Sequence, residues 1–207
     1  AMEGLRANYP PFAYYSAMNA LGTHDTPRIL TLLGVGSTCM EQSKSWRAEY
    51  RMTEDQRRRG LDLLKVGAVL LFCFPGSPTI YYGDEAGMEG FEDPFNRRPY
   101  PWGRANRSLV RWFSSLGSLR YRLEPLRRGD ITYFKAEGPV LAFQRACGKE
   151  KVLVALNAGT EEQLLPLPWP ARDQLTGEIF PAPGSRRLAA VLPPRTGRVL
   201  TPISIPL

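Results

Sequence analysis

The chain has 207 residues, with a hydrophobic fraction of 43% and a charged fraction of 23%, ordinary values for a polypeptide that folds around one large or two small cores. Its net charge is +7, but the basic residues form short clusters in several segments, so the composition favours a solvated surface and predicts no nucleic-acid partner. The longest apolar run, Val66 to Phe74, is far shorter than the roughly twenty residues of a membrane-spanning helix, so no membrane partner is predicted either.

A short apolar run from Ala17 to Leu21 predicts a strand, and it is followed by Gly-Thr-His-Asp-Thr-Pro-Arg. His24, the only histidine, and Asp25 stand at the carboxyl end of this strand, where sites on α/β folds are usually built. The alternative is that both side chains merely cap a turn by bonding to neighbouring backbone. The sequence of this segment alone does not choose between the two.

A long helix is predicted from Thr53 to Phe74. Thr-Glu-Asp-Gln at its start forms a capping box, and Pro75-Gly76 ends it. Its last turns are apolar on all sides, so we expect other elements to cover them. The preceding Leu33 to Ser37 lacks the third glycine and the lysine of a nucleotide loop, and is interpreted as a connection between strand and helix.

Two polar blocks follow the long helix. The first, at residues 75–85, reads P-G-S-P-T-I-Y-Y-G-D-E, and the second, at residues 93–102, reads D-P-F-N-R-R-P-Y-P-W. Asp84 and Glu85 are adjacent in an extended segment and point to opposite faces, so we interpret them as structural groups at a strand end and not as a carboxylate pair. Asp93 and Arg97 have the spacing of a surface ion pair that stiffens a loop.

Taken together, the segment around His24 and these two blocks resemble the α-amylase superfamily of glycoside hydrolases, and the last block is most similar to the neopullulanase and cyclomaltodextrinase branch. The resemblance implies an α/β part, strands 7 and 8 of a (β/α)8 barrel with their helices, followed by an antiparallel β-sandwich. Because such a barrel takes about 250 residues, the resemblance also implies that its first six units, with the aspartate nucleophile and the glutamate acid, lie outside this chain.

The resemblance assigns roles to four residues. Asp25 matches the carboxylate that stabilises the transition state, and His24 matches a histidine that bonds the hydroxyls of the same sugar unit. Asp93 and Arg97 match positions that contact sugar units on the non-reducing side of the cleaved bond, as an alternative to the surface ion pair. A retaining glycosidase needs two carboxyl groups about 5–5.5 Å apart, so the chain alone is expected to be inactive, with no cofactor and no metal.

The second half of the chain changes its pattern. A helix is predicted from Asn106 to Glu124, with Trp112 and Phe113 in its core stripe and Pro125 as a stop. Beyond Gly129 the short apolar runs predict strands of an antiparallel sandwich, at residues 131–134, 140–144, 152–156, 163–165, 187–192 and 197–200. The sequence therefore predicts two domains, the barrel portion at residues 1–127 and the sandwich at residues 128–207.

Two kinds of partner are predicted. An α-glucan oligosaccharide follows from the resemblance. The strands and helix faces whose barrel neighbours are missing predict binding to the absent barrel portion or self-association. A competing hypothesis makes the chain a non-catalytic carbohydrate-binding or assembly module that uses the sandwich, with Tyr133, Trp169 and Phe180 as scattered aromatic candidates.

Cys39, Cys73 and Cys147 are odd in number and widely separated, which predicts reduced thiols, no zinc centre and a cytoplasmic setting. Ala1-Met2 is typical of an added residue before an initiator methionine or of a cut inside a gene. A truncated gene product and a deliberately expressed part both remain open.

Overall fold

The structure is a computed structural model that describes residues 2–36, 41–182 and 187–203, so Ala1, Ser37 and Cys39, which the sequence analysis named, lie outside it. The described helices are α1 (Met2–Asn8), α2 (Pro11–Ser16), α3 (Ile29–Val35), α4 (Lys44–Glu49), α5 (Glu54–Cys73), α6 (Arg107–Arg122) and α7 (Glu124–Arg128). The described strands are β1 (Met18–Ala20), β2 (Ser77–Thr79), β3 (Asp130–Glu137), β4 (Val140–Cys147), β5 (Glu150–Asn157), β6 (Gln163–Pro166), β7 (Ala171–Asp173), β8 (Ile179–Phe180), β9 (Ala189–Leu192) and β10 (Thr196–Pro202).

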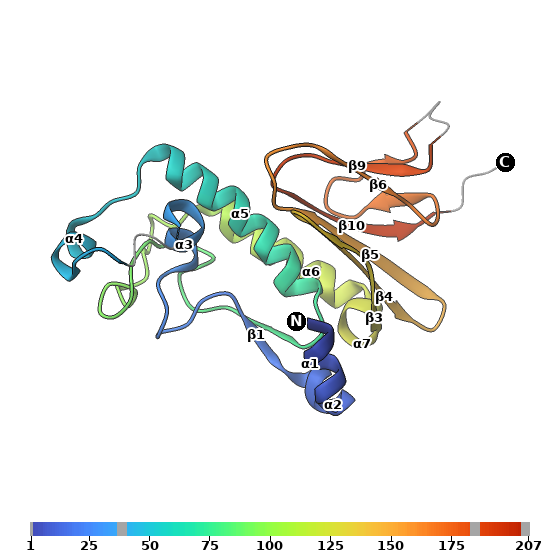
Figure 1. Ribbon diagram of the computed structural model, residues 1–207, viewed down its shortest axis with the longest axis horizontal. Coiled ribbons are helices and arrows are strands. Elements are labelled where there is room, and N and C mark those ends of the chain that lie inside the picture. Colours follow the sequence, from blue (N-terminus) through green and yellow to red (C-terminus); the bar gives the residue numbers. More distant parts are fainter. Residues whose placement is uncertain (1, 37–40, 183–186, 204–207) are drawn as a thin grey trace.

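The first part of the chain is an α/β unit. β1 pairs with β2 in parallel, with Met18 opposite Ser77 and Ala20 opposite Thr79. A parallel pair needs a crossover connection, and here the crossover contains α3, α4 and the long α5 (Figure 1). The strand predicted from Ala17 to Leu21 is therefore present, and the loop that carries His24 leaves from its carboxyl end.

Helix α5 begins and ends where the sequence predicts. The Thr53 hydroxyl accepts from the Gln56 backbone N–H, the Gln56 side chain accepts from the Thr53 N–H, and both bonds of the capping box are present. The helix ends before Pro75-Gly76, and Gly76 has a φ of 103°, which suits glycine. Close packing of α3 on α5 depends on a second glycine, because a Cβ on Gly60 would lie 2.9 Å from the Leu30 carbonyl oxygen.

The second part is a sandwich of two antiparallel sheets. One sheet has six strands in the order β3-β4-β5-β10-β7-β8, and the other pairs β6 with β9. Residues of both sheets form one hydrophobic cluster between them, which includes Leu153, Ala155 and Leu200 from the large sheet and Leu165 and Leu192 from the small one. The predicted sandwich is thus present, although the sequence analysis missed β7 and β8, which are only three and two residues long.

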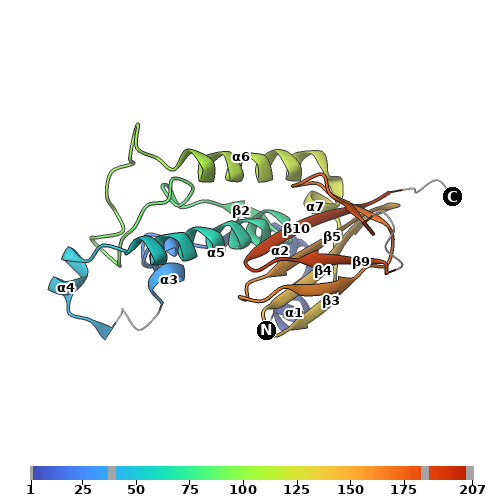
Figure 2. The same ribbon diagram turned by 90° about the horizontal axis from the view of Figure 1, so that it is seen from above.

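The large sheet is covered on its other face by helices. Figure 2 shows α5, α6 and α7 lying along this side of the sheet. Phe143, Val154 and Val199 of the sheet share a hydrophobic core with Leu64 of α5 and Leu116 of α6. Every residue of β5 from Val152 to Asn157 is buried, because the strand has helices on one face and the small sheet on the other.

Two arginines, the buried Arg145 and the half-buried Arg120, connect the end of α5 to this core. Arg145 of β4 donates to the Cys73 carbonyl at 2.7 Å and to the Gly129 carbonyl at 2.8 Å, and Arg120 of α6 donates to the Phe72 carbonyl at 2.7 Å. The last carbonyls of a helix have no partners inside the helix and carry partial negative charge, so guanidinium groups satisfy them well. Burial lowers the pKa of Arg145 to about 10, which leaves it charged at neutral pH.

Two predictions made from the sequence are corrected by the structure. Pro125 does not stop the chain's helical course, because it occupies the first turn of α7, where proline needs no N–H partner. The connection after His24 is not only a loop, since residues 33–35 belong to α3. The scattered aromatic candidates lie in different places: Phe180 is buried, Trp169 packs against the core between the two sheets, and Tyr133 packs against the helix-side core.

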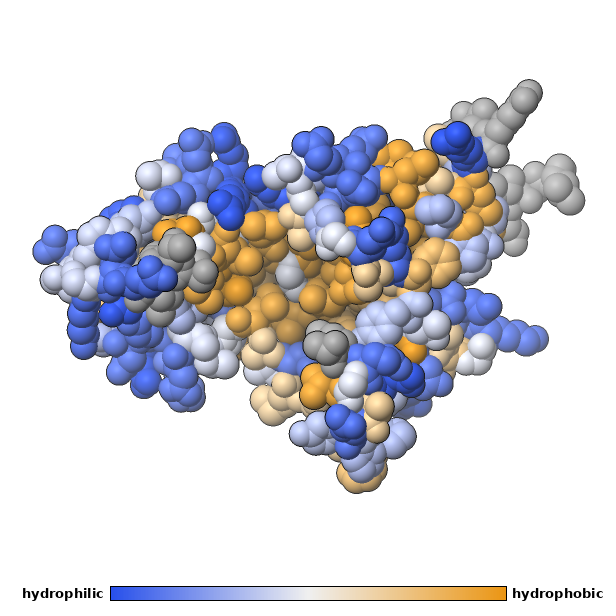
Figure 3. Space-filling view, in the orientation of Figure 1, coloured by the Kyte–Doolittle hydropathy of each residue, from blue (hydrophilic) through white to orange (hydrophobic). Residues whose placement is uncertain are grey.

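An apolar hollow lies between β1, the N-terminal helices and the end of α5. Figure 3 shows hydrophobic side chains gathered around it in the middle of this face. The cavity has a volume of about 610 Å³ and is lined chiefly by Leu5, Tyr14, Met18, Leu21, Leu70 and Phe74. Met18 is 76% exposed in spite of its place in a strand. The apolar last turns of α5 are therefore covered by α6 and the large sheet on one side. On the side of the hollow they are open. Within the described ranges, no helix combines the length and apolar character that a membrane crossing requires.

Candidate functional site

His24 and Asp25 project from the loop that follows β1. The His24 Nε2 lies 3.1 Å from the Asp25 Oδ1, and the two side chains are 62% and 74% exposed. The turn itself is closed by the flanking threonines, because the Thr23 N–H donates to the Thr26 Oγ1 at 3.1 Å and the Asp25 N–H donates to the Thr23 Oγ1 at 3.2 Å. Because the threonine hydroxyls accept the hydrogen bonds of the turn, the His24 imidazole and the Asp25 carboxylate remain available to a ligand.

A buried asparagine connects this loop to the second polar block, residues 93–102. Asn96 is fully buried, and its Nδ2 donates to the His24 carbonyl at 2.7 Å and to the Thr26 carbonyl at 2.8 Å. Asn96 lies between Asp93 and Arg97 in sequence, so the loops that carry all four predicted site residues are joined by one side chain. The sequence analysis did not single out Asn96, since nothing in the sequence shows which amide of an exposed-looking loop is buried.

Asp93 and Arg97 form the surface ion pair that their spacing predicts. The Arg97 Nε lies 2.8 Å from the Asp93 Oδ1, and the side chains are 48% and 61% exposed. An ion pair this exposed contributes about 0–1 kcal/mol to folding, so it fixes the loop only weakly. Its outward carboxylate oxygen and guanidinium N–H groups are suited to hydrogen bonds with hydroxyls.

Below the loops, a buried ion pair joins the segment around His24 to the first polar block, residues 75–85. The Arg28 Nη1 lies 3.1 Å from the Asp84 Oδ1, with side-chain exposures of 0% and 5%. The Arg28 guanidinium also donates to the Tyr82 carbonyl and lies over the Tyr81 ring, 4.3 Å from its centroid. Burial raises the pKa of the Asp84 carboxyl to about 6, although Arg28 acts in the opposite direction.

Asp84 and Glu85 do not form a carboxylate pair, which agrees with the interpretation of both as structural groups. The Asp84 carboxylate faces Arg28, whereas the Glu85 Oε2 accepts from the Gly83 N–H at 2.9 Å. Gly22 is needed beneath His24, because a Cβ there would overlap the Asp84 carboxylate. The segment around His24 and the first polar block therefore each contain a structural residue, Arg28 and Asp84 respectively. These two residues hold the loop of His24 and Asp25 in place.

The chemistry of this arrangement is recognition of polar groups. It offers an imidazole, two carboxylates and a guanidinium on neighbouring loops. The carboxylates accept from sugar hydroxyls, the guanidinium donates to them, and a neutral imidazole can do either. Among the residues that the structure describes, no group of three His, Cys, Asp or Glu side chains is arranged to hold a metal ion. The loops are thus suited to bind an uncharged polar ligand through hydrogen bonds.

Comparison with known proteins identifies relatives, although no family model matches the chain. It is 36% identical over 167 residues to an amylopullulanase of Thermoanaerobacter thermohydrosulfuricus, which covers 75% of this chain and 11% of that protein. It is 34% identical over 198 residues to a cyclomaltodextrinase of Geobacillus thermopakistaniensis, covering 90% of this chain and 29% of that protein.

A solved structure agrees with these sequence matches. The α-amylase of Geobacillus thermoleovorans, determined in complex with acarbose, superimposes with a TM-score of 0.76 at 25% identity and covers 97% of this chain and 41% of that one. The chain therefore spans less than a third of the two curated relatives and less than half of the solved structure.

Proposed function

This chain belongs to the α-amylase family of glycoside hydrolases, and from that premise we propose that it is the C-terminal portion of a retaining α-glucan hydrolase or transglycosylase. Its substrates would be α-1,4-linked maltooligosaccharides or cyclodextrins. The names of the relatives support this class, as does the acarbose bound to the similar α-amylase. The single observation that carries the proposal is the exposed His24–Asp25 pair, held by Asn96 beside the loop of Asp93 and Arg97.

We assign each site residue one role. Asp25 bonds the 2- and 3-hydroxyls of the sugar at the cleavage point and stabilises its distorted, oxocarbenium-like ring, and His24 bonds hydroxyls of the same unit. Bonds that strengthen as the ring distorts lower the barrier without breaking any covalent bond. Asp93 and Arg97 contact sugar units on the non-reducing side. The side chains of His24 and Asp25 take no part in the hydrogen bonds that close their turn, which supports these roles.

The barrel assignment is part of the same proposal. We take β1 and β2 as strands 7 and 8 of a (β/α)8 barrel, which the parallel pairing and the helical crossover between them support. The apolar hollow beside β1 would then receive the preceding strands and helices of the barrel, on another stretch of polypeptide. In their absence, a second copy of the chain would cover the same surface.

The chain by itself is expected not to hydrolyse glycosidic bonds. Two carboxyl groups about 5–5.5 Å apart are needed, one to attack the anomeric carbon and one to protonate the leaving oxygen. Asp25 has neither task in this proposal, and Asp84 is buried against Arg28. Incubation of the purified chain with maltoheptaose and β-cyclodextrin should produce no new reducing ends, and measurable turnover would disprove this part of the proposal.

Binding tests the site itself. We expect maltotriose to shift the backbone NMR signals of residues 22–26 and 93–97, and Asp25→Asn to weaken binding about tenfold, as loss of a hydrogen bond to a charged group predicts. Asp55→Asn is a matched control, since Asp55 is an exposed aspartate of α5. If Trp169→Phe weakened binding and Asp25→Asn did not, the sugar would bind to the sandwich and the proposed site would be wrong.

A reducing, cytoplasmic location is the last part of the proposal. Cys73 is buried and Cys147 is partly buried, and both thiols are free. Burial raises the pKa of the Cys73 thiol to about 12, which keeps it protonated and unreactive at neutral pH. Free thiols such as these are typical of proteins that work in a reducing compartment.

A further inference from the structure

We propose that the chain has a binding site for a phosphate group, separate from the sugar-binding loops, in a cavity of about 470 Å³ beside the second polar block. Three arginines line this cavity. Arg51 comes from the segment between α4 and α5, and Arg98 and Arg104 come from the long loop between β2 and α6. Tyr100 lines it between two prolines, Pro99 and Pro101.

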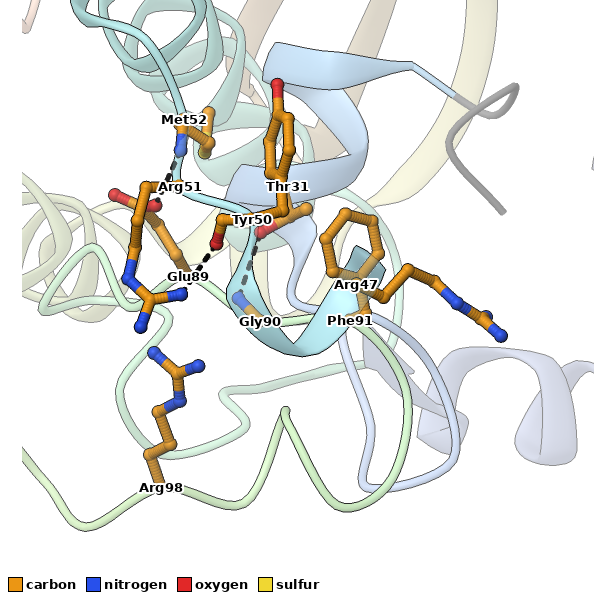
Figure 4. Close-up of a pocket in the computed structure, with 9 residues that line it drawn as sticks. All are labelled: Thr31, Arg47, Tyr50, Arg51, Met52, Glu89, Gly90, Phe91 and Arg98. Atoms are coloured by element: carbon orange, nitrogen blue, oxygen red, sulfur yellow. Dashed lines mark hydrogen bonds between the residues drawn. The ribbon is translucent and has the colours of Figure 1, made fainter. Parts of the chain in front are cut away.

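The arrangement of charges around this cavity favours binding of an anion. Figure 4, a close-up of a smaller adjoining cavity, shows the guanidinium groups of Arg51 and Arg98 approaching one another from opposite sides. Arg51 donates only to neutral backbone carbonyls, among them that of Tyr50 at 2.7 Å. Within the described part of the chain, the guanidinium groups of Arg98 and Arg104 have no hydrogen-bond or ion-pair partner.

The one carboxylate in the lining does not neutralise these arginines. The Glu89 Oε1 is paired with Arg57 of α5, and its Oε2 accepts from the Met52 N–H at 3.3 Å. Three positive groups therefore surround one cavity while its acidic residue is engaged elsewhere. Like charges around one cavity repel one another, and an anion bound between them would be attracted by all three.

The donor type and the size of the cavity select the anion. A guanidinium presents a planar fork of N–H donors that matches the oxygens of a phosphate, and several arginines around one pocket favour a doubly charged group over chloride. The volume exceeds what one phosphate fills, so the ligand is either free phosphate or a phosphate ester on a larger molecule. Pro99 and Pro101 restrict the backbone around the donors, which lowers the entropy lost on binding.

Titration with inorganic phosphate tests the site directly. We expect saturable binding by calorimetry at constant ionic strength, and we expect Arg98→Gln to weaken it about tenfold or more, the effect of losing a charge-assisted hydrogen bond. Among the described residues, the Arg98 guanidinium has no hydrogen-bond or ion-pair partner, so this variant should keep its unfolding midpoint. Arg59→Gln is the matched control, because Arg59 is exposed on α5 and removes the same charge. Unsaturable binding, or equal loss in both variants, would overturn the proposal.

A second arm identifies the source of the phosphate. Maltotriose 6-phosphate is compared with maltotriose and with inorganic phosphate, an arm that rests on the proposed function. If the ester binds at least tenfold more tightly than either, the site recognises phosphorylated glucan; if ester and inorganic phosphate bind equally, it recognises free phosphate. Binding of unphosphorylated maltotriose to Asp25→Asn tests the sugar site alone. The proposed sugar site and the proposed phosphate site can therefore be disproved independently of one another.

Discussion

The guanidinium of Arg28 meets the carboxylate of Asp84 at 3.1 Å in the interior of the molecule, although the two residues lie on loops that follow different strands. Arg28 follows β1 and Asp84 follows β2, so this contact fixes the relative position of the two strand ends. The loop of His24 and Asp25 begins directly above it. The ion pair is therefore a support for the candidate site and not a part of it.

Removal of Arg28 should destabilise the fold strongly at neutral pH. Arg28→Leu leaves the Asp84 carboxylate buried without its cation, and breaking such a pair from one side costs about 3–5 kcal/mol in the free energy of unfolding. Urea denaturation followed by circular dichroism measures this loss. The matched control is Arg58→Leu, whose exposed pair with Asp55 on α5 is worth about 0–1 kcal/mol. Equal effects of the two substitutions would contradict the structural role of Arg28.

Asp84 should make stability depend on pH between about pH 4 and pH 6. Burial raises its pKa from 3.8 to about 6 in the folded chain, so the folded state binds a proton that the unfolded state has released in this window. Stability linked to this group is thus fully present below about pH 4 and is lost as the pH rises through 6. A shift of about two units corresponds to roughly 3 kcal/mol.

The substitution Asp84→Asn isolates this effect. Urea midpoints measured from pH 4 to pH 7 should fall with rising pH in the wild type, and the difference between wild type and Asp84→Asn should change by roughly 3 kcal/mol across the window. Asp55→Asn, at an exposed position, should leave the slope as it is. A slope that survives in Asp84→Asn would mean that another carboxyl group is responsible.

The sequence predicted most of this fold because its strongest signals are local. The capping box at Thr53, the side-chain cap at Asn106 and the change of period after Gly129 all depend on neighbours in the chain, and α5, α6 and the main strands are present as predicted. The short strands β7 and β8 were missed because two or three residues give no measurable alternation. The helix α7 was missed because proline is both a helix stop and a favoured first residue.

The site was predicted only in part, for a different reason. His24, Asp25, Asp93 and Arg97 stand in recognisable blocks, whereas Arg28, Asp84 and Asn96 gain their importance from contacts between loops some fifty to seventy residues apart. Burial decides which of many arginines or asparagines becomes structural, and burial of a loop residue depends on the whole fold. In a sequence with many arginines, neither the buried Arg28 nor the three arginines of the cavity, Arg51, Arg98 and Arg104, can be distinguished from the others.

Asn96 should affect sugar binding without touching the sugar. Asn96→Ala removes both hydrogen bonds to the carbonyls of His24 and Thr26, which lets the loop of Asp25 move away from the loop of Asp93 and Arg97. We expect weaker maltotriose binding, about tenfold, as a misplacement of ligating groups predicts, together with broadened NMR signals at residues 23–26. Asn106→Ala, which removes only the cap of α6, is the control. Unchanged binding in Asn96→Ala would show that the two loops act independently.

The apolar hollow beside β1 should make the isolated chain associate with itself. Met18 is 76% exposed at the rim of this hollow, and covering a methionine side chain stabilises a complex by about 1.5–3 kcal/mol. Met18→Lys places a charge on that surface, so we expect its dissociation constant in sedimentation velocity to rise at least about tenfold above that of the wild type. Leu164→Lys, with 48% exposure on β6, makes the same change on the far side of the sandwich core and should leave association unchanged. If Leu164→Lys dissociated the oligomer and Met18→Lys did not, the sandwich would be the contact surface. The hollow would then not be the surface through which the chain associates.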